Sequence, residues 1–78
     1  MSKLDYEKGF YDSGELRWET WKLNGKYHNE EGPAFIWYRE NGSVWRKWWR
    51  LNGVEYSEEE WHEIVFRKAF EKAFEEVL

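Results

Sequence analysis

The sequence predicts an α+β fold, in which an antiparallel β-meander of two hairpin repeats is followed by a long C-terminal α-helix. The first observation is an internal repeat: Trp-Lys-Leu-Asn-Gly at residues 21–25 returns as Trp-Arg-Leu-Asn-Gly at residues 49–53, which gives a period of 28 residues. A fixed period is typical of a chain built from similar supersecondary units. The second is a series of Asn-Gly pairs between aromatic segments, which predicts tight turns between strands. The third is the segment 58–77, which contains neither Gly nor Pro and predicts one uninterrupted helix.

The length of 78 residues fits a single domain, with the sheet over residues 4–56 and the helix over residues 57–78. The chain has no cysteine, so disulfides and thiolate zinc sites are excluded. Its 7 Trp, 5 Tyr and 5 Phe are more rings than so small an interior encloses, and we expect some of them on the surface. No apolar run reaches the roughly 18 residues of a membrane-spanning helix, and residues 1–5 show no apolar signal segment. The expected location is the cytoplasm.

The net charge of -4 is concentrated at the C-terminus. Residues 1–56 hold nine acidic and nine basic side chains, whereas residues 57–78 hold seven acidic and three basic ones. A general nucleic-acid binder shows a basic excess. The charge distribution therefore argues against that class of function for the chain as a whole.

Four segments have the composition of strands. Residues 4–11 predict an edge strand, residues 15–23 an aromatic strand, and residues 43–51 its copy. Residues 34–39 form a compact apolar run, which predicts a central strand buried on both faces. Turns are predicted at residues 12–14, 24–25, 41–42 and 52–53. Strand position and repeat symmetry together predict a core of Trp21, Leu23, Phe35, Trp37, Trp49 and Leu51.

The helix begins with a capping box, since Ser57 is a favourable N-cap and Glu60 follows three residues later. At 100° per residue its apolar side chains point in two directions. One group, near the helix start, is expected to cover the sheet; it consists of Trp61, Ile64 and Val65. The other lies on nearly the opposite side and consists of Phe66, Phe70, Ala73, Phe74 and Val77. A helix that packs on one sheet needs only one apolar side.

Residues 21–34, which read W-K-L-N-G-K-Y-H-N-E-E-G-P-A, resemble the W-x-x-N-G-x-x-H-x-x-x-G-P-A pattern of MORN-like repeat proteins. This variant is found in phage and large-virus proteins and is related to the repeats of YwqK-type antitoxins. The second copy keeps Trp49, Leu51 and the following Asn-Gly pair, but has Tyr56 in place of the histidine and no Gly-Pro-Ala. The resemblance, over residues 10–57, implies a scaffold of β-hairpins and brings no catalytic residues.

The two histidines are the candidate catalytic or metal-binding side chains. His28 has the chemistry of a general base or a metal ligand, and the alternative is a structural histidine that bonds turn backbone. His62 and Glu58 have the spacing of a zinc-binding pair, but a third ligand is missing, and acids at a helix start already have an electrostatic role. The structural interpretation is favoured for both. We therefore expect no enzyme, no metal site and no cofactor.

The sharpest local signal is the run Trp-Arg-Lys-Trp-Trp-Arg at residues 45–50. Alternation along a strand places Arg46, Trp48 and Arg50 on one face, which Trp18 of the first repeat is expected to share. Trp45, Lys47, Trp49 and Leu51 fall on the other face, which is assigned to the core. The Arg/Trp face has three interpretations: internal cation–π packing, an anchor for a protein partner, or a platform that stacks single-stranded nucleic acid.

These observations predict a non-enzymatic protein-binding module. Its partner-binding residues are Arg46, Trp48, Arg50, Trp18, Phe66, Phe70 and Phe74. The resemblance to phage repeats suggests an inhibitor or adaptor acting in the host cytoplasm on a defence protein such as a CRISPR effector. Alternatives are a single-stranded nucleic-acid binder and an antitoxin-like partner protein. We also expect a homodimer through the distal helix, because three exposed phenylalanines are rare on a soluble monomer. Internal burial across a broad sheet and a target site on the helix are the competing explanations.

Overall fold

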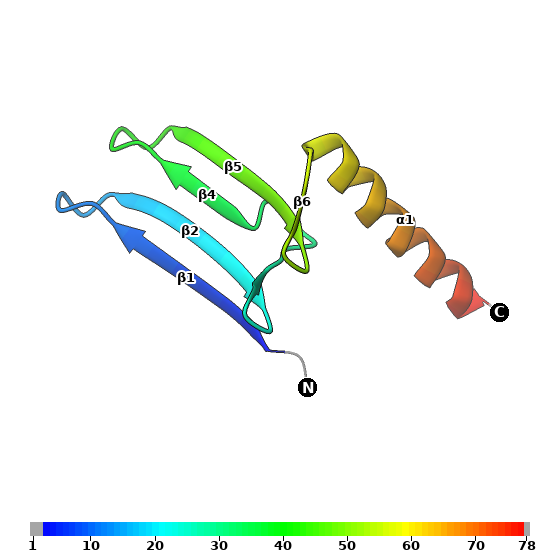
Figure 1. Ribbon diagram of the computed structural model, residues 1–78. Coiled ribbons are helices and arrows are strands. Elements are labelled where there is room, and N and C mark those ends of the chain that lie inside the picture. The colour runs from blue at the N-terminus through cyan, green and yellow to red at the C-terminus, as the bar shows by residue number, and fades with distance from the viewer. Residues whose placement is uncertain (1–2, 78) are drawn as a thin grey trace.

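The computed structural model describes the backbone of residues 3–77 and the side chains of residues 3–75. One antiparallel sheet precedes a single helix, as Figure 1 shows. The elements are β1 (Leu4–Phe10), β2 (Leu16–Leu23), β3 (Lys26–Tyr27), β4 (Phe35–Tyr38), β5 (Val44–Leu51), β6 (Val54–Tyr56) and α1 (Glu58–Val77). The predicted α+β meander with a C-terminal helix is confirmed. The helix is not long and apolar enough to cross a membrane.

The strands lie in the order β1-β2-β4-β5-β6, and the short β3 pairs with the end of β2. Every pairing is antiparallel. β2 and β5 begin and end 28 residues apart, so the sequence repeat is also a repeat of structure. Each repeat is a long hairpin, β1–β2 or β4–β5, whose second strand continues through a tight turn into a short strand, β3 or β6.

The tight turns are the same in both repeats. Asn24 and Asn52 each have a φ of 51°, and the glycines after them, Gly25 and Gly53, have φ values of 82° and 83°. Positive φ at both central residues is the conformation of a type I′ turn, which Asn-Gly adopts most readily. The turn prediction at these two sites is confirmed.

The core is much thinner than the sequence predicts. Of the six predicted core residues only Leu51 is buried, while Trp21, Leu23, Phe35, Trp37 and Trp49 are half-buried. The central strand β4 was expected to be buried on both faces, and all four of its residues are half-buried instead. The cause is that the one helix could cover only one face of the sheet, and it diverges from the sheet instead of covering it (Figure 1). The molecule is accordingly flat and long, with extents of 53 × 29 × 20 Å.

The helix is attached through its first turns. The predicted capping box is present: the Ser57 amide donates to Glu60 Oε1 at 3.0 Å, and the Glu60 amide donates to Ser57 Oγ at 3.1 Å. Trp61 is only 4% exposed, and its indole Nε1 donates a hydrogen bond to the carbonyl of Asn29 at 2.9 Å. Its ring also packs on Trp49, with centroids 4.7 Å apart. One tryptophan thus joins the helix to the second repeat and to the loop before β4.

Candidate functional site

The strand register gathers aromatic side chains on one face of the sheet. Directly paired residues share a face, so the pairs Trp18↔Trp37 and Trp37↔Arg46 form one row across three strands. A second row contains Phe35 and its partner Trp48. We call this the aromatic face and define it by Trp18, Phe35, Trp37, Arg46, Trp48 and Arg50. The prediction that Trp18 shares a face with Arg46, Trp48 and Arg50 is therefore correct.

The rings at the centre of the aromatic face pack on one another. Phe35 and Trp37 stack with centroids 3.7 Å apart, and Trp37 meets Trp48 edge-on at 4.5 Å. The guanidinium of Arg50 lies 4.6 Å from the centroid of Trp48. This arrangement matches the internal cation–π interpretation of Trp48, whose ring is already covered by neighbours. Trp48 and Arg50 therefore stabilise the aromatic face by packing on each other, and their side chains are less available to a partner than those of exposed residues.

Trp45 lies on the side of the aromatic face, although the alternation of side chains along the strand predicts the opposite face. It was assigned to the core face, but its side chain is 57% exposed and borders the same cavity as Trp18 and Trp37. The cause is a β-bulge: Trp37 pairs with Arg46, whereas Tyr38 pairs with Val44, so β5 carries one extra residue at this point. A bulge redirects a side chain that would otherwise point to the opposite face. The sequence of the strand alone gives no signal for it.

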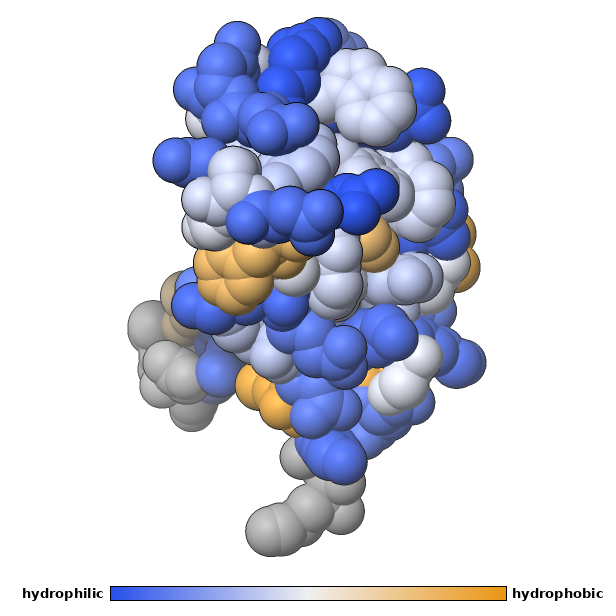
Figure 2. Space-filling model, turned by 90° about the vertical axis from the view of Figure 1, so that its left-hand side faces the viewer, coloured by the Kyte–Doolittle hydropathy of each residue, from blue (hydrophilic) through white to orange (hydrophobic). Residues whose placement is uncertain are grey.

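The bulge completes an aromatic cavity of about 470 Å³ at the end of the sheet where β1 turns into β2 and β4 turns into β5. Its lining residues are Tyr11, Arg17, Trp18, Phe35, Trp37, Tyr38 and Trp45. Two arginines lie over rings at this end: Arg17 is 5.3 Å from the Tyr11 centroid and Arg46 is 5.3 Å from the Trp45 centroid. Figure 2, which views this end, shows pale side chains of intermediate hydropathy between hydrophilic ones. Such a surface suits a partner that supplies aromatic or apolar groups together with acidic ones.

The opposite face contains a carboxylate that the sequence did not single out. Glu19 accepts hydrogen bonds from the hydroxyls of Tyr6 and Tyr38, which come from β1 and β4. Burial and this bond to a carboxylate raise the pKa of Tyr38 to about 12, and the bond to Glu19 raises the pKa of Tyr6. The group ties three strands together. Only the register shows it, because the residues are far apart in the chain.

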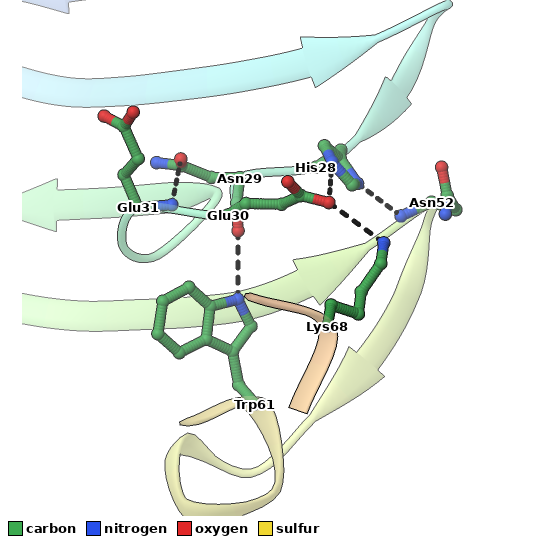
Figure 3. Close-up of polar contacts among 7 residues, drawn as sticks. All are labelled: His28, Asn29, Glu30, Glu31, Asn52, Trp61 and Lys68. Carbon is green, nitrogen blue, oxygen red and sulfur yellow. Dashed lines mark hydrogen bonds and ion pairs between the residues drawn. The ribbon is translucent and has the colours of Figure 1, made fainter. Parts of the chain in front are cut away.

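His28 joins the two repeats, as Figure 3 shows. It is 7% exposed, and its Nδ1 accepts a hydrogen bond from the Asn52 amide at 2.9 Å, so this nitrogen carries no proton. Its Nε2 lies 3.6 Å from Glu30 Oε1, which also accepts a hydrogen bond from Lys68 of the helix at 3.0 Å. The bond from Lys68 lowers the pKa of Glu30. The geometry is that of a structural histidine bonded to turn backbone.

His62 has one acidic neighbour, Glu58, at 3.5 Å. Within the described part of the chain, no three His, Asp or Glu side chains lie close enough together to hold a metal ion. The imidazole instead lies beside Trp49 and Trp61, with centroid distances of 5.5 and 4.9 Å.

The outer side of the helix is apolar and uncovered. Phe66, Phe70 and Phe74 are 73%, 65% and 59% exposed, and we call them the phenylalanine stripe. The side chain of Val77, which was expected to extend this stripe, lies outside the described side chains. The alternative in which the helix crosses the sheet and buries both sides is wrong for the single chain. The apolar group that was expected to cover the sheet does face it, since Trp61 is buried and Ile64 and Val65 are half-buried.

No family model, no curated protein and no solved structure matches the chain. The MORN-like resemblance therefore stays a prediction, which rests on the motif residues and on the repeated hairpins.

Proposed function

We propose that this chain is a non-enzymatic protein-binding module that acts as a homodimer. The observation that carries the proposal is the phenylalanine stripe, three rings more than half exposed on the side of the helix that faces away from the sheet. Soluble proteins rarely leave a contiguous apolar patch of this kind in water, and such patches mark protein interfaces. Each aromatic side chain presents an area of about 150–250 Å² to be buried, so six such rings from two helices would form the centre of a modest interface.

A second copy suits the stripe when the two helices run antiparallel around a two-fold axis at Phe70. Phe66 of one helix then meets Phe74 of the other. Arg67 and Glu71 follow one flank of the stripe, and the two-fold axis would bring Arg67 of each helix beside Glu71 of the second copy. The other flank carries the small side chains Ala69 and Ala73, which allow close approach. A parallel pair would place both charged side chains against this small-residue flank and form no ion pair.

The aromatic cavity of the sheet is the proposed site for the target protein. Trp45 lines it with an exposed ring, and the exposed guanidinium of Arg46 lies over that ring; Trp and Arg are the residue types that dominate binding energy at interfaces. The resemblance of residues 21–34 to phage repeat proteins favours an inhibitor or adaptor, so a host defence protein is the first class of target to test. Each subunit of the dimer would present one such cavity, so the module would be bivalent.

Affinity capture from host lysate with matched variants tests this assignment. Trp45→Ala with Arg46→Ala is expected to lose the captured protein at least tenfold, since hot-spot truncations cost about 2 kcal/mol or more. Phe10→Ala is the matched control, because Phe10 is similarly exposed at 54% but lies at the opposite edge strand. Equal retention by all variants would contradict the cavity as the target site.

Single-stranded nucleic acid is the second candidate, favoured by the Arg46 guanidinium over the exposed Trp45 ring. Anisotropy of a labelled mixed-sequence oligonucleotide distinguishes the two. Binding that weakens steeply with salt and requires Trp45 would replace the protein target by nucleic acid.

A further inference from the structure

The outer edge of β5 is open over most of its length. β6 pairs with β5 only at Trp49, Arg50 and Leu51. Residues 44–48 have no described strand on that side. Figure 1 shows β6 and the start of α1 at one end of β5, with the helix leading away. An edge of this kind presents unpaired backbone donors and acceptors to solvent.

The first repeat shows what such an edge accepts. β2 uses its end, Lys22 and Leu23, to pair with β3, and uses Trp18, Glu19 and Thr20 to pair with β4. The period of 28 residues places Arg46, Lys47 and Trp48 at the positions of these three residues. The edge that carries β4 in the first repeat is therefore repeated in the second, where the chain turns into the helix and supplies no strand.

The backbone of β5 is oriented for the same pairing. The Trp48 carbonyl points to the β4 side, where it accepts from the Ala34 amide at 2.8 Å, and the Arg50 carbonyl accepts from the Asn29 amide at 3.2 Å on that same side. Backbone groups of successive residues point to opposite edges of a strand. The N–H and C=O of Lys47 consequently point outward. Glu19, its equivalent in the first repeat, pairs there with Ile36 of β4.

The side chains along the edge define the partner's chemistry. Trp48 and Arg46 lie on the aromatic face, and Lys47, between them, points to the other face. A strand docked in the register of β4 would set residues opposite Trp48, Lys47 and Arg46 in turn. Aromatic residues suit the first and last of these positions, as Phe35 and Trp37 do in β4, and an acidic residue suits the middle one.

We propose that β5 binds an extended segment of a protein partner by strand addition at residues 46–48, with the pattern aromatic–acidic–aromatic. This inference rests on the proposed protein-binding function and specifies its partner. Arg46 and Lys47 are both exposed, and neither forms an ion pair with another described residue, so both charges are available. Backbone pairing supplies the affinity and the alternating side chains supply the specificity.

The chain's own first strand is a poor occupant of this edge. In the same register a second copy of β1 would set Lys8 opposite Lys47, and like charges directly opposite are destabilising. This repulsion disfavours head-to-tail addition of subunits, which would otherwise produce open filaments. It leaves the edge to a different chain.

A peptide derived from β4 tests the proposal on the full-length protein. The probe is the acetylated and amidated segment 33–39 carrying Ile36→Glu, which places glutamate opposite Lys47. The comparison peptide carries Ile36→Lys. We expect saturable binding of the glutamate peptide by NMR titration, at least about threefold tighter than the lysine peptide. Bound peptide should also protect the Lys47 amide from hydrogen exchange, while the amides of β1 stay unchanged.

Two variants of Lys47 separate backbone pairing from charge. Lys47→Pro removes the outward N–H and is expected to weaken binding about tenfold, since proline fits an edge strand whose N–H faces solvent. Lys47→Thr keeps the N–H and should weaken it about threefold at most. Lys47→Glu should reverse the preference between the two peptides.

No saturation at about 1 mM peptide, saturation without protection of the Lys47 amide, or equal affinity for both peptides would overturn the proposal. Protection is measured on the wild-type protein, so the test stands even where the proline variant does not fold. A target captured through Trp45 together with a failed peptide titration would reject the strand site alone. The peptide titration does not depend on dimer formation. A failed titration therefore rejects the strand site without rejecting the dimer, and a monomeric mass rejects the dimer without rejecting the strand site.

Discussion

Glu19 and Lys47 occupy the same position in the two repeats, but only Glu19 has a strand on both sides; Lys47 pairs with β4 on its inner side alone. The Glu19 backbone faces Ile36 of β4, and its carboxylate accepts from Tyr6 and Tyr38 on the neighbouring strands. On its outer side Lys47 has no paired strand, and its side chain forms no ion pair with another described residue. The same strand edge is thus paired inside the sheet in the first repeat and exposed to solvent in the second. We infer that binding is concentrated where the repeat series ends.

Trp61 should contribute far more to stability than Trp45, although both are tryptophans. Trp61→Ala would remove a buried ring and its bond to the Asn29 carbonyl, and is expected to lower the free energy of unfolding by about 3–5 kcal/mol. Trp45→Ala should change it by about 0.5 kcal/mol or less, because the ring is mostly in water. Urea unfolding followed by circular dichroism measures both. Similar losses in the two variants would contradict the assignment of Trp61 as the attachment of the helix.

His28 is expected to act through its acceptor nitrogen. His28→Ala leaves the Asn52 amide without its partner and should cost about 1–3 kcal/mol. His28→Asn keeps an acceptor close to the position of Nδ1 and should recover part of that loss. Added Zn²⁺ should leave the melting temperature of the wild type unchanged. A zinc-dependent rise that His28→Asn abolishes would restore the metal-ligand interpretation.

The hydroxyl of Tyr38 predicts loss of stability at alkaline pH. Its pKa in the folded protein is raised to about 12, above the value of 10.0 expected for the unfolded chain. The folded state therefore keeps the proton longer, and the stabilisation, fully present below pH 10, is lost as the pH rises from 10 to 12. Because the side chain is only half-buried, we expect a loss of about 1–2 kcal/mol.

Tyr38→Phe is the matched variant for this prediction. It should be less stable at pH 8 by about 1–2 kcal/mol, through loss of the bond to Glu19. Its stability should then fall less steeply between pH 10 and 12, with Tyr6 accounting for the remaining slope. Parallel pH profiles for the two proteins in urea titrations would assign the alkaline transition to other groups.

Features encoded locally were predictable from the sequence. The type I′ turns follow from Asn-Gly, and the capping box follows from Ser57 and Glu60, because each depends on a few neighbouring residues. The placement of Arg46, Trp48 and Arg50 on one face, the aromatic face, followed from the alternation of side chains along a strand. The division of the helix into a sheet-facing apolar group and a separate phenylalanine stripe followed from the period of 3.6 residues per turn.

Features set by long-range packing were not predictable. Trp21 and Phe35 lie on opposite faces of the sheet, so one helix can cover only one of them, and no residue pattern specifies that this helix diverges from the sheet. The exposure of Trp45 depends on a bulge opposite Trp37 and Tyr38, which shifts the alternation by one residue. The carboxylate of Glu19 gained its role only from the register of three strands.

Light scattering after size exclusion at about 10 µM tests the central claim, that the phenylalanine stripe is a protein interface covered by a second copy. The wild type should elute with twice the chain mass of 9.7 kDa. The double variant Phe70→Glu with Phe74→Glu should elute as a folded monomer with an unchanged circular dichroism spectrum. A wild-type mass of 9.7 kDa would contradict the dimer.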